Sequence, residues 1–230
     1  MKWINKYELA SFKSLLLGAH FNPYVIFNTF LAEEQVNFDV FLKIYKKYSK
    51  KKEMSGFMKY FDLPSNLARA FFYARVLNLH KQMNKKILDL GTGVGYFPFA
   101  VNFLGHNCVA LDKKENKVYL SLRNLLNVNT INETIRPLKL MKIKGDLKFD
   151  IITSFQILYD IDKEKMWNEE SWKFFIGMLR KNFLKPDGQI FLQMNTIYQK
   201  DLDQYKKNIK TFKILGGKKL RRDGEFIFSY

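Results

Sequence analysis

The sequence predicts an α/β fold built on a doubly wound, mainly parallel sheet of seven strands. Three observations predict it. After residue 84, short apolar runs alternate with longer helical patterns, as in consecutive βαβ units. One apolar run leads directly into a glycine-rich turn and a helix. The last two apolar runs follow each other without a helix between them, which indicates an antiparallel hairpin that closes the sheet.

Each predicted strand is a short apolar run bounded by Asp, Gly or Pro. The seven runs are 87–90, 108–111, 135–138, 151–155, 189–194, 212–215 and 225–229. Helical patterns lie between them at roughly 95–105, 116–128, 167–183 and 198–210. Crossover helices of this length place helices on both faces of a parallel sheet. We therefore expect residues 85–230 to form one domain with helices on both faces of its sheet.

Residues 1–84 form a predicted N-terminal helical extension. One stripe at helical spacing consists of Phe38, Phe41, Leu42, Tyr45 and Tyr48. A second stripe, which follows the typical helix start Pro64-Ser65, consists of Leu67, Ala70, Phe71, Ala74 and Leu77. Simple packing onto the rest of the protein explains both stripes, and a surface that faces a substrate is the alternative. We expect this extension to act as a cap that carries the substrate region.

The composition excludes several classes of protein. Among 230 residues, 47% are hydrophobic and 16% aromatic, which is enough to fill a core and excludes general disorder. The only cysteine, Cys108, excludes an intrachain disulfide, and with three histidines in the chain we predict no metal site. No apolar run is long enough to span a membrane, and no signal peptide is visible. These features predict a cytoplasmic protein.

The net charge of +17 suggests an anionic partner, but its distribution weakens that interpretation. Lysine accounts for 32 of the 39 basic residues, and arginine is the better residue for bidentate phosphate contacts. The excess is spread over both halves of the chain. Its densest part is 200–222, where nine basic residues accompany two acidic ones. A solvated lysine surface and a functional surface for an anionic partner both remain open.

The most informative segment is 87–97, a predicted strand that runs into a glycine-rich turn and then a helix. The turn reads Asp89-Leu90-Gly91-Thr92-Gly93-Val94-Gly95. Glycines allow positive φ and let a ligand lie against bare backbone, while the helix start offers N–H groups and positive dipole. Asp112 ends the next predicted strand, where an acid accepts hydrogen bonds from both ribose hydroxyls. A plain tight turn and a helix-capping Asp112 are the structural alternatives.

The details of the turn select among nucleotide ligands. The dinucleotide fingerprint needs a third glycine where Tyr96 stands, and no Gly-Lys-Ser/Thr follows as a phosphate loop requires. A carboxylate at Asp89 would repel a pyrophosphate. It suits S-adenosylmethionine, whose sulfonium and ammonium can meet Asp89, whose carboxylate can meet backbone N–H groups, and whose ribose can meet Asp112.

These residues resemble the class I S-adenosylmethionine-dependent methyltransferases. The glycine motif and Asp112 match the family's first motif and ribose-binding acid. The stretch 148–155 is similar to its fourth strand, and Pro186-Asp187-Gly188 to the turn entering its fifth. The resemblance implies a Rossmann-like fold, a methyltransferase of the small-molecule type and a cofactor site. The expected cofactor-binding residues are Asp89, Gly91, Gly93, Gly95, Asp112, Phe155 and Gln156.

The sequence departs from this family after the third predicted strand. Many members place an acid there against the adenine amino group, but no acid follows 135–138 until Asp146. Backbone and apolar groups are then expected to hold adenine. No catalytic residue is singled out. His20, His80 and His106 are interpreted as surface or packing residues, whereas Asp160 and Asp162 are candidates for a general base or for substrate positioning.

Three functions follow as predictions. The first is methyl transfer to a small-molecule acceptor, such as a hydroxyl of a sugar or another metabolite. The alternative is an RNA or other nucleic-acid methyltransferase that uses the basic C-terminal surface. Against it, the Asn/Asp-Pro-Pro-Tyr/Phe signature of base amino methylation is absent at 154–157, where Ser-Phe-Gln-Ile stands. The third is a non-catalytic protein that binds the cofactor.

Overall fold

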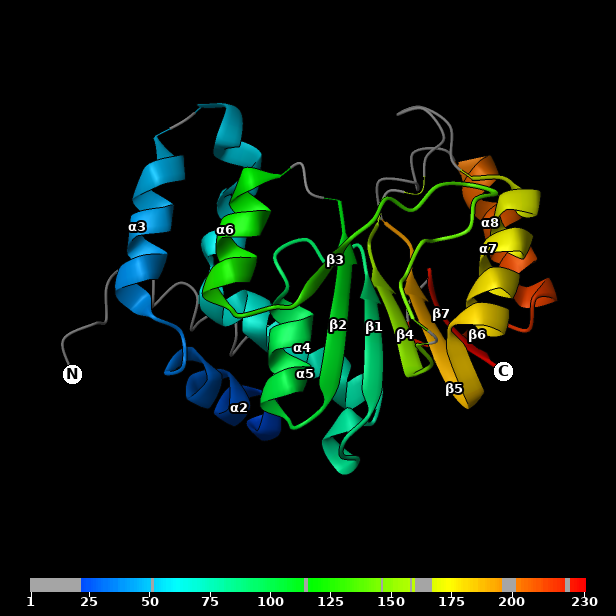
Figure 1. Cartoon of the computed structure of the whole chain (residues 1–230), viewed down its shortest axis with the longest axis horizontal. Helices are drawn as coiled ribbons and strands as arrows, with labels where there is room; N and C mark the ends of the chain where they lie inside the picture. Colours follow the sequence, from blue (N-terminus) through cyan, green and yellow to red (C-terminus); the bar gives the residue numbers. More distant parts are fainter. Residues whose placement is uncertain are drawn as a thin grey trace. The chain divides into compact units, whose positions relative to one another are not determined.

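The fold is described from a computed structural model of the chain, which is shown in Figure 1. The structure describes residues 22–50, 52–113, 116–145, 147–157, 159, 167–195, 202–221 and 224–230. They form two compact units. The unit that we call the sheet unit comprises 85–92, 108–114 and 130–230, and the helical unit comprises 1–84, 93–107 and 115–129, each over its described residues.

The sheet unit contains a seven-stranded mixed sheet in the order β3-β2-β1-β4-β5-β7-β6 (Figure 1). The strands are β1 Lys86–Leu90, β2 Asn107–Asp112, β3 Thr130–Asn132, β4 Phe149–Phe155, β5 Leu184–Gln193, β6 Lys218–Lys219 and β7 Glu225–Ser229. The pairs β2–β3, β1–β4 and β4–β5 are parallel, while β5–β7 and β6–β7 are antiparallel. The predicted Rossmann-like α/β class, with its C-terminal antiparallel hairpin, is confirmed.

Two predicted strands were wrong in position. The third strand is β3 at Thr130–Asn132, whereas 135–138 is loop and turn, because Pro137 has no N–H for a ladder and Leu138 has a φ of 54°. Residues 212–214 are the end of helix α8 (Leu202–Ile214), not a strand. Phe212 continues the buried face of that helix, and the strand that pairs with β7 begins later, at Lys218.

Helices α7 (Glu169–Asn182) and α8 lie side by side over the half of the sheet that contains β5 (Figure 1). Between them and the sheet lies an aromatic core of Tyr159, Trp167, Trp172, Phe175, Phe212, Phe226 and Phe228. Edge-to-face contacts dominate it, for example Trp172 with Phe212 at 4.8 Å between ring centroids. The hydroxyls of Tyr159 and Ser154 are hydrogen-bonded at 2.6 Å, so this core reaches the carboxyl-terminal half of β4.

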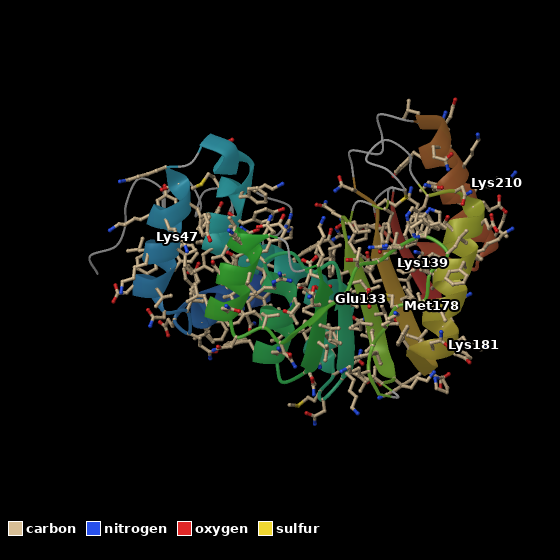
Figure 2. The ribbon with its side chains drawn as sticks, turned by 45° about the horizontal axis from the view of Figure 1, so that its top comes forward. Lys47, Glu133, Lys139, Met178, Lys181 and Lys210 are labelled. Carbon is tan, nitrogen blue, oxygen red and sulfur yellow. The ribbon has the colours of Figure 1, made fainter. Side chains whose placement is uncertain are left out.

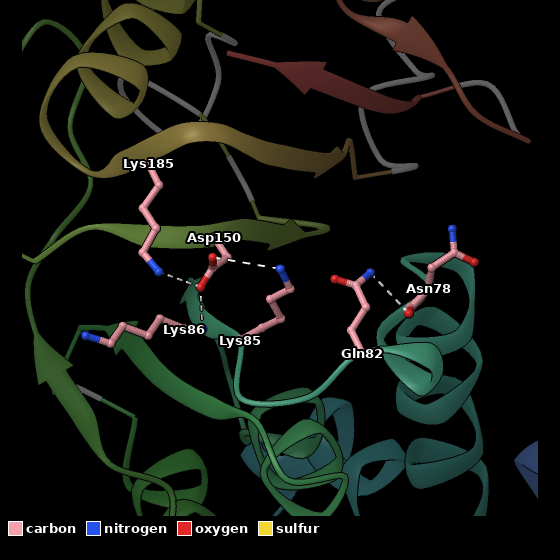
Figure 3. Close-up of polar contacts among 6 residues, drawn as sticks. All are labelled: Asn78, Gln82, Lys85, Lys86, Asp150 and Lys185. Atoms are coloured by element: carbon pink, nitrogen blue, oxygen red, sulfur yellow. Dashed lines mark hydrogen bonds and ion pairs between the residues drawn. The ribbon is translucent and has the colours of Figure 1, made fainter.

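An acid near the amino end of β4 joins three strands of the sheet (Figure 3). The carboxylate of Asp150 accepts from the Lys185 ammonium on β5 at 2.9 Å and from the Lys86 N–H on β1 at 2.8 Å. The Lys85 ammonium lies 4.0 Å away. Burial alone would raise the pKa of Asp150, but these donors lower it below the ordinary value. Asp150 therefore holds the edge of the sheet opposite to the strand ends considered below.

The helical unit contains α2 Pro23–Glu33, α3 Phe38–Ser49, η1 Lys52–Phe61, α4 Leu63–Val76, η2 Leu79–Lys81, α5 Tyr96–Phe103 and α6 Lys117–Leu125. Helix α4 packs against α2 and α5, and α3 packs against α6 (Figure 1). The Asp62 carboxylate caps α4, whose predicted apolar stripe is buried. In α3 only Phe41 and Tyr48 of the aromatic stripe are buried. Along the described residues, no helix is both long and apolar enough to cross a membrane.

Candidate cofactor site

The carboxyl ends of β2, β1 and β4 carry the acids and aromatics that the sequence singles out. Strands β1 and β4 are parallel and pair Asp89 with Thr153. Because neighbouring parallel strands end at the same edge of a sheet, Asp89 lies beside the ends of β2 and β4. Asp112 is the last residue of β2 and Phe155 the last of β4. The structure thus brings the predicted residues of the sheet unit to one edge.

Asp89 is a buried acid whose side chain is only 2% exposed. The Thr153 hydroxyl donates a hydrogen bond of 2.7 Å to its carboxylate. Burial raises the pKa of Asp89 to about 7, the Thr92 and Thr153 hydroxyls oppose that rise, and the negative charge of Asp112 adds to it. The carboxylate is thus short of positive charge, which a cationic ligand group would supply.

The first glycine of the motif turns the chain at the end of β1. The N–H groups of Gly91 and Thr92 donate to the Leu111 carbonyl at 2.7 and 3.2 Å, which ties the turn to β2. Gly91 has a φ of 61°, and a Cβ there would lie 2.4 Å from Cδ1 of Ile157. Both features require glycine, since a side chain would be strained and would collide. Ile157 was not predicted to belong to this site.

The other two glycines are counted with the helical unit and also have left-handed backbone. Gly93 has a φ of 59°, and Gly95, the N-cap of α5, has a φ of 91°. A Cβ on Gly95 would come within 3.0 Å of the Val128 side chain, so close packing as well as conformation demands glycine there. The motif therefore forms an unusual turn, and its contact with a cofactor stays a prediction.

Asp112 is half-buried at the end of β2. Its Oδ1 accepts the Lys113 N–H at 2.8 Å, which orients the carboxylate at the strand end. Asp112 pairs with Asn132 of β3, and its charge contributes to the raised pKa of Asp89. Two carboxylates thus influence each other at one edge of the sheet, an arrangement typical of a ligand site.

Phe155 ends β4, and Gln156 follows it in a conformation that neighbouring residues hold. Gln156 has a φ of 54°, which is uncommon for a residue other than glycine. Its N–H donates to the Gln193 carbonyl at 2.9 Å, and its own carbonyl accepts from the Asn195 amide at 2.7 Å. Phe155 contacts Phe191 at 5.2 Å between ring centroids. Residues with left-handed backbone that neighbouring groups hold in place occur preferentially at functional sites. The Gln156 side chain is exposed.

Glu133 is an acid that sequence reasoning missed. Because β3 ends at Asn132, Glu133 is the first residue after the third strand (Figure 2). Its N–H donates to the Asp112 carbonyl at 3.2 Å, and its carboxylate accepts the N–H groups of Thr134 at 2.8 Å and Lys142 at 3.2 Å. The expectation that no acid follows the third strand before Asp146 depended on the misplaced strand and was wrong.

Other predicted residues belong to the helical unit or lie outside the described residues. His20, Asp146, Asp160 and Asp162 belong to the second group. His106 is buried in the helical unit, where its Nε2 lies 3.1 Å from the Leu79 carbonyl. His80 also belongs to the helical unit, and the centroid of its ring lies 5.4 Å from the centroid of the Tyr24 ring. In the described ranges, no three His, Cys, Asp or Glu side chains are placed to hold a metal ion.

Comparison with known proteins supports the fold more strongly than the substrate. No family model matches the chain. A tRNA U34 carboxymethyltransferase of Ruthia magnifica subsp. Calyptogena magnifica is 30% identical over 130 residues, which are 55% of this chain and 36% of that protein. The chain therefore spans little more than a third of this relative's length.

Solved structures match large parts of the chain. A protein described as an S-adenosyl-L-methionine-dependent methyltransferase of Methanococcus maripaludis matches with a TM-score of 0.50 and 13% identity, over 80% of this chain and 92% of that one. A ribosomal protein L11 methylase of Lactobacillus delbrueckii subsp. bulgaricus matches with a TM-score of 0.44 and 16% identity, over 70% and 78%. The protein has the fold of the class I S-adenosylmethionine-dependent methyltransferases, and the resemblance found in its motifs is confirmed at that level.

Proposed function

We propose that the protein is an S-adenosylmethionine-dependent methyltransferase. The observation that carries this proposal is the juxtaposition of a buried Asp89, the left-handed Gly91 and the half-buried Asp112 at one edge of the sheet. In this proposal Asp89 meets the cationic amino-acid end of the cofactor, and Asp112 accepts hydrogen bonds from the ribose hydroxyls. Gly93, Gly95, Phe155 and Gln156 complete the proposed binding residues.

The residues present fit this cofactor chemically. Burial raises the pKa of Asp89 to about 7, so an ionised Asp89 is costly without a cation beside it. A sulfonium or ammonium group removes that cost, whereas a pyrophosphate would increase it. Glu133, next to Asp112, provides the acid that family members use for the adenine amino group. We therefore assign it as a candidate for that role.

When bound, the cofactor would supply a methyl group already activated for in-line displacement. The chain's own residues then need only hold two reactants in line and exclude water. Asp89, Asp112 and the end of β4 would fix the donor in place. For a hydroxyl acceptor a base must also remove a proton, and Asp160 and Asp162 remain the candidates for that role.

Calorimetric titration with S-adenosylmethionine and S-adenosylhomocysteine tests the proposal. Asp112→Ala should weaken binding by about ten- to a hundredfold, because two hydrogen bonds to a carboxylate are lost. Asp150→Ala is the matched control, since that acid lies near the opposite ends of the strands, and it should bind both ligands like the wild type. Failure of the wild type to bind either ligand would refute the function. Unchanged affinity in Asp112→Ala would refute the assignment of that residue.

For the acceptor we retain the small molecule that the sequence predicts, and transfer to RNA is the second candidate. Two observations favour RNA. The relative from Ruthia magnifica is named as a tRNA-modifying enzyme. In addition, exposed lysines gather on α8 and β6, namely Lys206, Lys207, Lys210, Lys213, Lys218 and Lys219. Figure 2 labels Lys210 on α8 and Lys181 at the end of α7.

An incubation with methyl-labelled S-adenosylmethionine separates the candidates. Fractionated extract is supplied as total RNA, glycans and small metabolites, and the label is followed into each. Label in the metabolite or glycan fraction supports the small molecule, and label in RNA supports the second candidate. Binding without label in any fraction would support the third possibility, a protein that binds the cofactor without transfer. Location in the cytoplasm stays a prediction of the sequence.

A further inference from the structure

The connection between β3 and β4 is long and has no crossover helix. Parallel strands of one sheet are usually joined through a helix, but residues 133–145, all of them described, contain neither helix nor strand. We call these residues the β3–β4 loop, and the whole loop belongs to the sheet unit. Connections of this length without secondary structure of their own are uncommon, and they often carry a function.

The first part of the β3–β4 loop is closed by hydrogen bonds to one carboxylate. Glu133 accepts the N–H of Thr134 at 2.8 Å and the N–H of Lys142 at 3.2 Å. Because positions 134 and 142 share this acceptor, the residues between them close into a compact loop. The Met141 side chain is 7% exposed and packs into the hydrophobic core of the sheet unit. The protein thus holds this loop at its base and at Met141.

Two leucines of this closed loop are exposed. Leu138 is 47% exposed and Leu140 is 63% exposed, on either side of Lys139, which Figure 2 labels. Leu138 also has a φ of 54°, which is a strained conformation for a leucine. Strained backbone that the surrounding structure fixes occurs preferentially at functional sites. Strain and exposed apolar surface therefore coincide at one position, where an asparagine would relieve both.

The exposed leucines are accompanied by cations. Residues 134–145 contain no acid, and their basic residues, all exposed, are Arg136, Lys139, Lys142 and Lys144. Apolar side chains among cations match the surface of an anionic membrane, where leucines enter the boundary of the hydrocarbon and basic side chains meet the phosphates. Each basic residue close to such a surface contributes about fivefold to the affinity.

Other partners fit this surface less well. RNA is bound through cations and through stacking on aromatic rings, and leucines supply neither. A second copy of the loop would bring like charges together. A protein partner normally buries about 800 Å² on each side, far more than two leucines provide. A membrane needs no such area, because lipid phosphates add a contact for each cation.

We propose that the β3–β4 loop attaches the protein peripherally to anionic membranes. Leu138 and Leu140 enter the boundary between headgroups and hydrocarbon, and the surrounding cations bind lipid phosphates. Attachment of this kind requires no membrane-spanning helix. It also requires no cofactor, so its test does not depend on the proposed function.

Sedimentation with lipid vesicles tests the proposal in the full chain. The wild type should bind vesicles that contain phosphatidylglycerol about a hundredfold more tightly than vesicles of phosphatidylcholine alone. Leu138→Asn combined with Leu140→Ser should weaken binding to the anionic vesicles by about tenfold, because the insertion of two leucines is lost. Asparagine tolerates positive φ, so urea should unfold this double variant no earlier than the wild type. Weaker binding then cannot be attributed to unfolding.

Leu202→Ser is the matched control, since Leu202 is 57% exposed on α8 of the same unit, and it should bind like the wild type. A fluorophore sensitive to polarity reports the contact directly. Cys108 is the only cysteine of the chain and is buried, so the label can be confined to Leu140→Cys or to Leu202→Cys. Anionic vesicles should shift the emission to the blue at position 140 and leave it unchanged at position 202.

Four results would overturn the proposal. The wild type could show no preference for anionic vesicles, or the label at position 140 could keep its emission when they are added. The double variant could bind them like the wild type, which would indicate adsorption of the net charge of +17 through other lysines. A blue shift at position 140 with total RNA and not with vesicles would assign the loop to RNA.

Discussion

The buried carboxyl of Asp89 should make the stability of the ligand-free protein fall as pH rises. Burial raises its pKa from the ordinary value of about 4 to about 7. Between these values the folded protein holds a proton that the unfolded chain has released. Since the unfolded state binds fewer protons, the free energy of unfolding decreases with pH in this range. Integrated from about pH 5 to about pH 8, Asp89 alone removes about 3 kcal/mol.

Asp89→Asn isolates this contribution. An asparagine keeps the shape and can still accept the Thr153 hydroxyl through its Oδ1, the atom that now accepts at 2.7 Å. It has no charge to bury, so it should lack the pH dependence. Other groups titrate in both proteins, and they cancel when the two free energies are subtracted.

The assay is urea unfolding of both proteins, followed by circular dichroism in steps from about pH 5 to about pH 8. We expect the wild type to lose about 3 kcal/mol relative to Asp89→Asn over this range, with the steepest change at about pH 5 to 6 and a levelling off above about pH 7. A difference that is constant with pH would show that Asp89 is ionised throughout and would refute the argument from burial. A difference that changes in the opposite direction would show that its pKa is lowered by an unrecognised cation.

Three further predictions follow from the same edge of the sheet and its opposite. As pH rises toward about 7, cofactor affinity should increase by up to about tenfold per pH unit, because a cationic ligand needs ionised Asp89. Calorimetry of Asp89→Asn should show no such dependence on pH. Gly91→Ala should lower the free energy of unfolding by about 2 kcal/mol, since the new methyl group would be strained at positive φ and would collide with the Ile157 side chain. In an Ile157→Ala background that loss should be smaller, and an equal loss would assign the whole cost to the backbone. Asp150→Ala should cost about 1 kcal/mol, as solvent screens its partly exposed ion pairs. The low pKa of Asp150 means that this contribution is present above about pH 4 and disappears as acid protonates it, which urea unfolding at lower pH would detect.

The fold could be predicted because its strands and helices give the apolar residues of the sequence a clear periodic pattern. Alternation after residue 84 predicted the parallel strands. The two successive apolar runs at 212–215 and 225–229 predicted the hairpin, although its first strand is β6 at Lys218–Lys219 and not 212–215. The failures have local causes. Residues 135–138 look apolar enough for a strand, but the conformation around Pro137 excludes a ladder. Phe212 fits a strand pattern and a helix pattern equally well, and only its packing against Trp172 decides.

The residues of the candidate site could be predicted where a sequence motif requires a particular backbone conformation. Gly91 and Gly95 signal positive φ, and both have it. Residues that act through packing leave no such signal. Thr153 contacts Asp89 because β1 and β4 pair in one particular register, which the sequence does not specify. Glu133 was hidden by the misplaced third strand, because the strand ends at Asn132 and not at residue 138.

The aromatic core described above also makes the sheet unit optically distinct. Two of the three tryptophans of the chain, Trp167 and Trp172, are each 1% exposed in that core. The third, Trp3, lies outside the described residues. In a Trp3→Phe variant, all indole fluorescence would therefore come from the sheet unit, with emission shifted to the blue by the apolar surroundings. Indole emission would then follow the sheet unit alone, while circular dichroism follows the helices of both units, and a difference between their transitions would show that the two units unfold separately.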